Sequence, residues 1–210
     1  AVIGSEEFID GNWNDYASLL EPWSENLDCE GLYGNKMVCY VDGVSIILSG
    51  VGTDFMSQGH EAFITEKLSV ASDWTICAWH KANNDLRISN KDDNDNLGIN
   101  YYNLCKNSQA IIASGYDMAY ARTRLLTNLN PIITEKTIDL SKGSFAFISG
   151  LGGYGVDKYD CTMHDSDTWW ASLYSSNIYK NEVGASTKSC DQNPVNLASG
   201  AMFITFNYKH

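Results

Sequence analysis

The chain is poor in positive charge and contains no long apolar run. Each shortage excludes a class of partner. Its 210 residues include 14 lysines and arginines against 26 aspartates and glutamates, which gives a formal net charge of -12. Nucleic acids and anionic membrane surfaces repel an acidic chain, so we expect neither as a partner. No apolar stretch approaches the ~20 residues that cross a bilayer, so no membrane insertion is expected. An acidic surface is also an ordinary means of staying soluble, and it assigns no function by itself.

Several motifs of common catalytic and binding sites are absent. There is no Walker phosphate loop, no Gly-x-Ser-x-Gly nucleophile elbow, no CxxC pair and no Asn-x-Ser/Thr sequon. The missing CxxC argues against a zinc ribbon or a thioredoxin-like redox site. Without a nucleophile elbow, nothing ties a serine to His164 as a catalytic base. No cofactor is expected.

Six cysteines are spread along the chain. An even, widely separated set favours disulfides in an oxidising compartment, and six reduced thiols buried as small apolar groups are the alternative. We expect at least two disulfides, and sequence does not choose among the fifteen pairings. Together with a first residue that is not methionine, this predicts a processed extracellular protein. The disulfide candidates are Cys29, Cys39, Cys77, Cys105, Cys161 and Cys190.

Hydrophobic periodicity predicts one mixed domain over residues 1–210. Apolar, β-branched runs at 44–51, 111–114 and 144–149 are typical of buried strands, whereas 61–70 repeats at helical spacing. A further helical patch lies within 12–30, and Pro22 should end it. Strands that alternate with helices early, followed by a strand-rich end, predict an α+β or α/β fold.

The most informative segment, residues 111–123, is an apolar strand followed by a glycine turn and a polar loop. It reads Ile-Ile-Ala-Ser-Gly-Tyr-Asp-Met-Ala-Tyr-Ala-Arg-Thr. This loop resembles the Gly-His-x-His loop, followed by Tyr-x-Arg, of the calcineurin-like metallophosphoesterases, which include the purple acid phosphatases. The two histidines of that family bind a pair of metal ions, and Tyr116 and Met118 stand in their places here. A phenol and a thioether are poor ligands for hard cations.

Other segments resemble the same family in the same order. Residues 1–8 resemble a strand followed by Gly-Asn-His-Asp, with Ser5 and Glu6 where the family has the ligands Asn and His. Residues 74–80 resemble a strand that ends in a metal-binding histidine, and His80 is the one ligand position that matches. The remaining likenesses are a hairpin with an Asp-Gly turn at 37–48, a helix at 58–68, a strand and glycine turn at 145–153, and a closing strand at 201–207. The resemblance implies a metallophosphoesterase-like β-sandwich flanked by helices, with a degenerate metal centre.

The resemblance covers only the second half of the family domain. The family's earlier Asp-x-His and Gly-Asp-x-x-Asp strands have no counterpart here. Because the family's sheets use both halves, a lone half would expose a sheet edge and an apolar face. We therefore expect insertions that close the fold, or a partner that supplies the missing strands. That partner is a separate chain, a cleaved N-terminal part or another copy. In the last case we expect a homo-oligomer or filament whose contact involves Ala1–Phe8 or Met202–Tyr208.

Two weaker patterns suggest ligands. The loop that contains Asp92, Asp93 and Asp95 has the oxygen donors that calcium prefers, but the full EF-hand pattern is absent and a solvated loop tip is the alternative. Aromatic residues near the former cleft and farther along could stack on a sugar ring, and core packing is their alternative. These aromatic residues are Trp79, Tyr116, Tyr120, Trp169 and Trp170.

Three functions are left open. The main interpretation is an extracellular, non-catalytic, metallophosphoesterase-like protein that acts as a structural or assembly subunit. The second is a carbohydrate-binding or small-ligand-binding module that uses the former active-site cleft. The third is a metal-dependent phosphoesterase completed by another chain, which is disfavoured because His80 alone cannot hold two metal ions.

Overall fold

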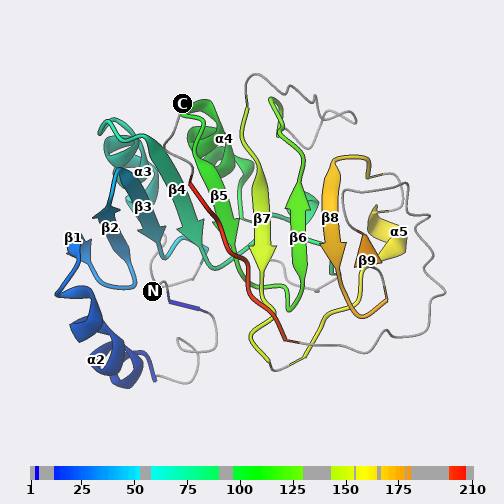
Figure 1. The fold of residues 1–210 in the computed structure, drawn as a ribbon, viewed down its shortest axis with the longest axis horizontal. Helices are drawn as coiled ribbons and strands as arrows, with labels where there is room; N and C mark the ends of the chain where they lie inside the picture. Colours follow the sequence, from blue (N-terminus) through cyan, green and yellow to red (C-terminus); the bar gives the residue numbers. More distant parts are fainter. Residues whose placement is uncertain are drawn as a thin grey trace.

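The computed structural model describes residues 3–4, 12–52, 58–89, 97–129, 143–153, 155–164, 167–177, 179–180 and 199–206. Its centre is one mixed sheet of nine strands in the order β1-β2-β3-β4-β5-β7-β6-β8-β9 (Figure 1). None of the described helices is long and apolar enough to cross a bilayer. The strands are β1 (Asp28–Leu32), β2 (Lys36–Val41), β3 (Val44–Ser49), β4 (Trp74–Trp79), β5 (Ile111–Ser114), β6 (Tyr120–Thr123), β7 (Ala146–Ser149), β8 (Trp170–Tyr174) and β9 (Tyr179–Lys180). The helices are α2 (Trp13–Ser24), α3 (His60–Leu68), α4 (Ile99–Asn107) and α5 (Cys161–His164), with a short 3-10 helix at Asn84–Leu86.

β2 and β3 form a tight antiparallel hairpin because the two residues between them adopt a left-handed backbone. Asp42 has φ 46° and Gly43 has φ 79°. Glycine has no Cβ to clash in this region, and aspartate tolerates it better than most residues. The turn pairs Val41 with Val44, so the hairpin predicted at 37–48 is confirmed.

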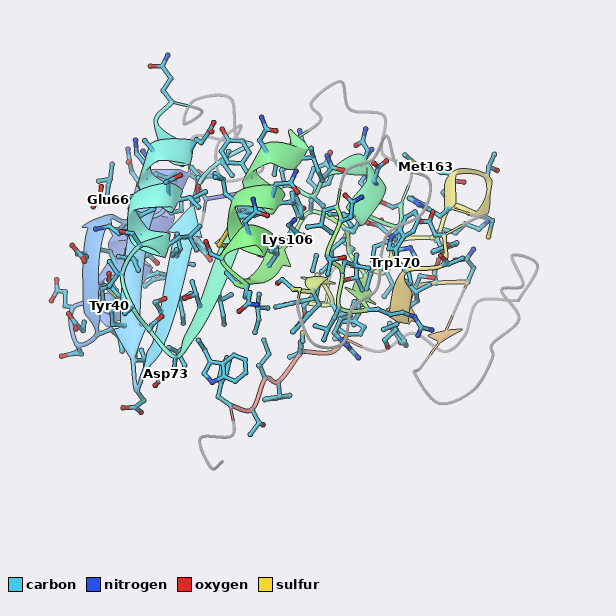
Figure 2. All side chains as sticks on the ribbon, turned by 90° about the horizontal axis from the view of Figure 1, so that it is seen from above. Tyr40, Glu66, Asp73, Lys106, Met163 and Trp170 are labelled. Carbon is cyan, nitrogen blue, oxygen red and sulfur yellow. A yellow bond between two sulfur atoms is a disulfide. The ribbon has the colours of Figure 1, made fainter. Side chains whose placement is uncertain are left out.

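Four strands run parallel, and two crossover helices lie on one face of the sheet. β3, β4 and β5 pair in parallel and are connected by α3 and α4. β7 then pairs in parallel with β5, while β6 runs antiparallel between β7 and β8. Figure 2 shows α3 and α4 side by side on the same side of the sheet. The mixed fold with helices flanking a sheet is as the sequence predicted, and the carboxyl ends of the parallel strands meet at one edge.

The main core lies between this helical layer and the sheet. Alternate side chains of β3 and β4, such as Ile47 and Cys77, are buried against the helices. Ser49 at the end of β3 shares a hydrogen bond of 2.8 Å with the Nδ1 atom of His60 in α3. Cys77 forms a disulfide with Cys105 in α4, which fastens the second crossover helix to the sheet.

The opposite face of the sheet, which we call the open face, is only partly covered. Its side chains alternate with those of the core, and Ile46, Leu48, Ile76 and Ala78 on this face are half-buried. Residues 199–206 cross this face, drawn in red in Figure 1 and lying opposite the helices in Figure 2. Among the described residues, helices thus cover one face of the sheet, while α2 and this strip cover part of the other.

α2 covers one end of the open face. Its inward side packs a small apolar cluster on β2, and Trp13 stacks on Tyr33 with ring centroids 5.9 Å apart. Its outward side exposes Tyr16, Leu19 and Trp23, which recur at helical spacing. The helix therefore has apolar side chains on both sides. Within the described residues, only its inward side packs against the rest of the protein.

The disulfide prediction is confirmed. Cys29 pairs with Cys39 across β1 and β2, Cys77 pairs with Cys105, and Cys161 is disulfide-bonded as well. No cysteine in the described part of the chain is free. Cys190 lies outside the described residues. Structural disulfides of this kind are typical of proteins that mature in an oxidising compartment.

Three expectations about local structure were wrong. Pro22 does not end the first helix, because α2 continues to Ser24 and loses only one backbone bond in its final turn. Residues 201–206 are extended but form no strand. The helix α4 and the strand β6 were not predicted, because the tyrosine-rich start of α4 has weak periodicity and β6 has only four residues.

The buried His60 predicts a pH-dependent stability. Burial lowers the pKa of His60 from 6.5 to about 4, and the nearby Lys36 adds repulsion. Between these values the unfolded chain binds a proton that the folded protein does not. The contribution of His60 to the free energy of unfolding is therefore fully present above about pH 6.5. It falls by about 3 kcal/mol as the pH drops toward 4. Urea unfolding at several pH values measures this loss.

The variant His60→Gln provides the control for that measurement. Glutamine keeps a polar partner for Ser49 but does not titrate. We expect its stability to fall less steeply between pH 6.5 and 4 than that of the wild type. Equal slopes for the two proteins would assign the pH dependence to other groups.

Candidate functional site

Loops from four parallel strands converge at one edge of the sheet. Residues 50–52, 80–83, 115–118 and 150–153 follow β3, β4, β5 and β7. The backbone N–H of Gly115 donates to the carbonyl of His80 at 2.9 Å, so the second and third loops touch. This is the edge at which open α/β sheets bind ligands, and it carries His80 and Tyr116, two of the predicted site positions. We take it as the candidate site.

Tyr116 lies at the centre of this edge among basic side chains. Its φ of 73° is left-handed, an uncommon state for a tyrosine that the surroundings must hold in place. The His80 ring meets it edge-on with centroids 5.6 Å apart. Lys81 Nζ lies 5.3 Å from the ring centroid and Arg87 Cζ lies 5.9 Å from it, within the range of cation–π attraction. Both basic residues are buried, at 7% and 2% exposure.

Asp117, the next residue, is a buried carboxylate that fastens this loop to residues 88–89. Its Oδ2 atom accepts the backbone N–H of Ile88 at 2.7 Å and that of Ser89 at 3.1 Å. Its Oδ1 atom accepts the Ser89 hydroxyl at 2.6 Å. Charge-assisted bonds to three donors satisfy the carboxylate, so Asp117 holds the loop rather than a ligand.

The far side of the loop is fixed by Asp157 and Gly150. The backbone N–H of Met118 donates to Asp157 Oδ2 at 2.7 Å, and the backbone N–H of Asp157 donates to the Met118 carbonyl at the same distance. Gly150 lies so close that a Cβ atom on it would be 1.9 Å from the backbone oxygen of Asp117. Close packing therefore explains why a glycine follows β7, since any side chain there would displace the loop.

The described residues at this edge offer few metal ligands. Among the described residues, no three His, Cys, Asp or Glu side chains lie close enough together to hold one. Lys81 and Arg87 lie beside Tyr116, which stands at one of the ligand positions of the resemblance. His80 is half-buried and its ring faces Tyr116.

Five predicted ligand positions cannot be placed. They lie outside the described residues and comprise Ser5, Glu6, Asp92, Asp93 and Asp95.

The aromatic residues predicted to bind a ligand fall into two groups. Trp79, Trp169 and Trp170 are buried in the main core, where their ring faces are covered. Core packing, the alternative left open by the sequence, describes their place in this structure. Tyr116 and Tyr120 are half-buried, at or near the candidate edge.

A groove of about 420 Å³ adjoins Tyr120 on the open face. It lies between β6, β7 and β8 on one side and residues 200–203 on the other, and Tyr120 pairs with Tyr174 across β6 and β8. Arg122 is the one charged residue among its described lining residues, and none of these is acidic. The lining is formed by Tyr120, Arg122, Ser149, Leu151, Tyr174, Gly200, Ala201, Met202 and Phe203.

Sequence reasoning missed the residues that dominate the candidate edge. Lys81 and Asp117 each directly follow a motif position, but they were passed over because the family pattern assigns them no role. Arg87 lies well away from both motifs in sequence, and only the fold brings it to Tyr116. A signal was present, since a titratable residue follows both His80 and Tyr116.

Comparisons with known proteins give distant structural likenesses, among them a purple acid phosphatase and PhoD. No family model and no curated protein sequence matches the chain. A purple acid phosphatase, PPD1, from seeds of yellow lupin (Lupinus luteus) is 16% identical, with 66% of this chain and 26% of that chain covered and a TM-score of 0.48. The structure of PhoD is 13% identical, with 71% and 34% covered and a TM-score of 0.41. The chain thus spans about a quarter to a third of these structures, and likenesses this low transfer no activity, metal or substrate.

Removing the Asp117 carboxylate should destabilise the fold. In Asp117→Ala, three buried donors on Ile88 and Ser89 lose their acceptor, and we expect a loss of roughly 3–5 kcal/mol in the free energy of unfolding. Ser89→Ala removes only one of these bonds and should cost about 1 kcal/mol. Denaturant unfolding of the two variants makes the comparison. Equal losses would show that the backbone bonds contribute little.

Proposed function

We propose that this protein is an extracellular, non-catalytic structural subunit with a metallophosphoesterase-like frame that assembles with copies of itself. The observation that carries the proposal is the contrast between the two faces of the sheet. Helices seal one face, and half-buried apolar side chains such as Ile46 and Ile76 lie on the other. An apolar sheet face is stable in water only when another layer covers it. A second copy of the chain can supply this layer without any other protein.

Exposed apolar side chains at both ends of the open face support association. Trp23 on α2 is 76% exposed and Phe203 on the C-terminal strip is 91% exposed. Leu19 on α2 is also exposed. Single exposed apolar residues are ordinary, but aromatic and aliphatic residues gathered on one face are typical of protein interfaces.

The basic surroundings of Tyr116 support the non-catalytic part of the proposal. A two-metal phosphoesterase needs carboxylates and histidines that clamp both ions. Here Asp117 is engaged by residues 88–89, and Lys81 and Arg87 face the ring that stands at a ligand position.

The extracellular part of the proposal is supported by the cysteines. Cys29, Cys39, Cys77, Cys105 and Cys161 are all disulfide-bonded. Such bonds persist outside reducing compartments, where they stabilise the fold.

A second candidate function is the binding of a sugar or another small ring. The groove beside Tyr120 favours it, because Tyr120, Tyr174 and Phe203 offer aromatic surface and Arg122 offers hydrogen-bond donors. Of the five aromatic residues expected from sequence to bind a ligand, Tyr120 is the one among the described lining residues of this groove. Because the groove opens on the same face, a bound ligand there would compete with assembly.

The first prediction from this proposal concerns catalysis. The purified protein should show no metal-dependent hydrolysis of an aryl phosphate when manganese, zinc or iron is added, since the described residues of the edge include no group of three metal ligands. The rate of product release with and without metal measures this, and His80→Ala should be indistinguishable from the wild type. Metal-dependent turnover that disappears in His80→Ala would contradict the proposal.

The second prediction concerns assembly. At micromolar concentration, light scattering coupled to size exclusion should give a mass that is a multiple of the 23.3 kDa chain. A net charge of -12 opposes association, so the assembly should strengthen when salt shortens the Debye length from ~30 Å at 0.01 M to ~8 Å at 0.15 M. A monodisperse monomer at both salt concentrations would overturn the structural role.

A further inference from the structure

The C-terminal strip, residues 201–206, is an extended segment whose backbone makes no hydrogen bond. Gly200 donates to the carbonyl of Leu151 at 3.0 Å, and no residue from 201 to 206 takes part in a hydrogen bond. Ordered backbone groups normally have partners, and the described residues of a single copy offer none to these groups. The strip therefore presents two free strand edges.

The side chains of the strip already alternate as in a strand. Met202, Ile204 and Phe206 are half-buried toward the sheet, while Ala201, Phe203 and Thr205 are exposed. The ring of Phe206 contacts Trp74 at the start of β4, with centroids 5.4 Å apart. The strip contains no charge, no proline and no glycine, which is unusual for a solvated loop and typical of a pairing strand.

The strip runs across the open face in the direction expected for the first strand of a second sheet packed on it. It leaves Leu151, beyond the carboxyl end of β7, and reaches Trp74, at the amino end of β4 (Figure 1). It therefore crosses the parallel strands from their carboxyl side to their amino side on the open face, opposite α3 and α4 in Figure 2. Two packed sheets cross at such an oblique angle, and one strand alone cannot cover the face beneath it.

Charge favours a second copy of the same chain at this strip. Two chains of net charge -12 repel each other, so they approach best where acidic residues are absent. The strip has no acidic residue, and the described lining of the adjoining groove has none either and includes Arg122. By contrast, α2 carries Asp15 and Glu21 on its exposed surface.

We propose that residues 201–206 of two copies pair with each other as antiparallel strands, so that a two-fold homodimer supplies the start of the second layer. The proposal rests on the self-assembly proposed above and names the segment that makes it. A segment paired antiparallel with itself is self-complementary and closes on two-fold symmetry. The central pair is Phe203 with Phe203 of the second copy, because this register covers the most exposed of the large apolar side chains with its twin. The same register places Ala201 opposite Thr205 of the second copy.

Single cysteines on the exposed side of the strip test the pairing and its direction. Directly opposite residues in antiparallel strands bring their Cβ atoms within ~4.5–5.5 Å, close enough for a disulfide or a short thiol crosslinker. Phe203→Cys should crosslink with itself. Ala201→Cys and Thr205→Cys should each fail to crosslink alone and should form a heterodimer when mixed. Thr162→Cys, on the exposed side of α5, is the control that should not crosslink.

Proline substitutions test whether backbone bonds make the contact. Adjacent N–H groups of a strand point to opposite edges, so either Ile204→Pro or Thr205→Pro removes a bond between the copies. We expect one of these variants to weaken the dimer at least tenfold, while Thr205→Ala keeps wild-type affinity. No hydrogen bond within one copy is lost in either variant, so circular dichroism and thermal unfolding should be unchanged.

The outcomes separate this proposal from the proposed function. If the protein assembles but Phe203→Cys crosslinks no better than Thr162→Cys and neither proline weakens assembly, the strip is not the contact and the structural role stands. Homodimers from Ala201→Cys and Thr205→Cys alone would show parallel pairing and overturn the antiparallel register. A wild-type protein that is monomeric at every concentration and salt would overturn both.

Discussion

The fold depends on a constraint of connectivity: parallel strands joined by short crossovers place their helices on one side. β3, β4 and β5 follow this rule with α3 and α4, and the Cys77–Cys105 disulfide locks the second helix to its strand. Everything on the helical side follows, including the burial of Trp79 and Tyr102 in the core. These helices do not cover the open face. Among the described residues, α2 packs at one end of that face and residues 199–206 cross it.

The same parallel arrangement creates the candidate edge, and local chemistry decides what the edge can do. Side chains after β4 and β5 must meet because the strand ends are neighbours. The chain places a tyrosine between lysine and arginine at that meeting point and uses the adjacent carboxylate to bind backbone. The result is a well-packed corner in which Lys81 and Arg87 lie beside the ring of Tyr116.

Sequence predicted the elements whose signal is local and missed those whose place is set by distant partners. The β2–β3 hairpin follows from the Asp42-Gly43 turn and two apolar runs, and β5 follows from four apolar or small residues. α4 has little periodicity of its own, and its disulfide to Cys77 and the buried Tyr102 hold it in place. At the edge, His80 and Tyr116 were found from a motif. Arg87 could not be found, because only folding brings it beside Tyr116.

The contact between Gly150 and the backbone of Asp117 has a consequence for anyone who would install chemistry at this edge. The loop that carries residues 116–118 is held from both sides, by bonds to residues 88–89 and Asp157 and by a glycine with no room for a side chain. New ligands at 116 and 118 would inherit a backbone already committed to another geometry. The stability of the protein would therefore limit such a redesign more than the choice of ligand residues would. A variant stabilised at other positions would be a useful starting point.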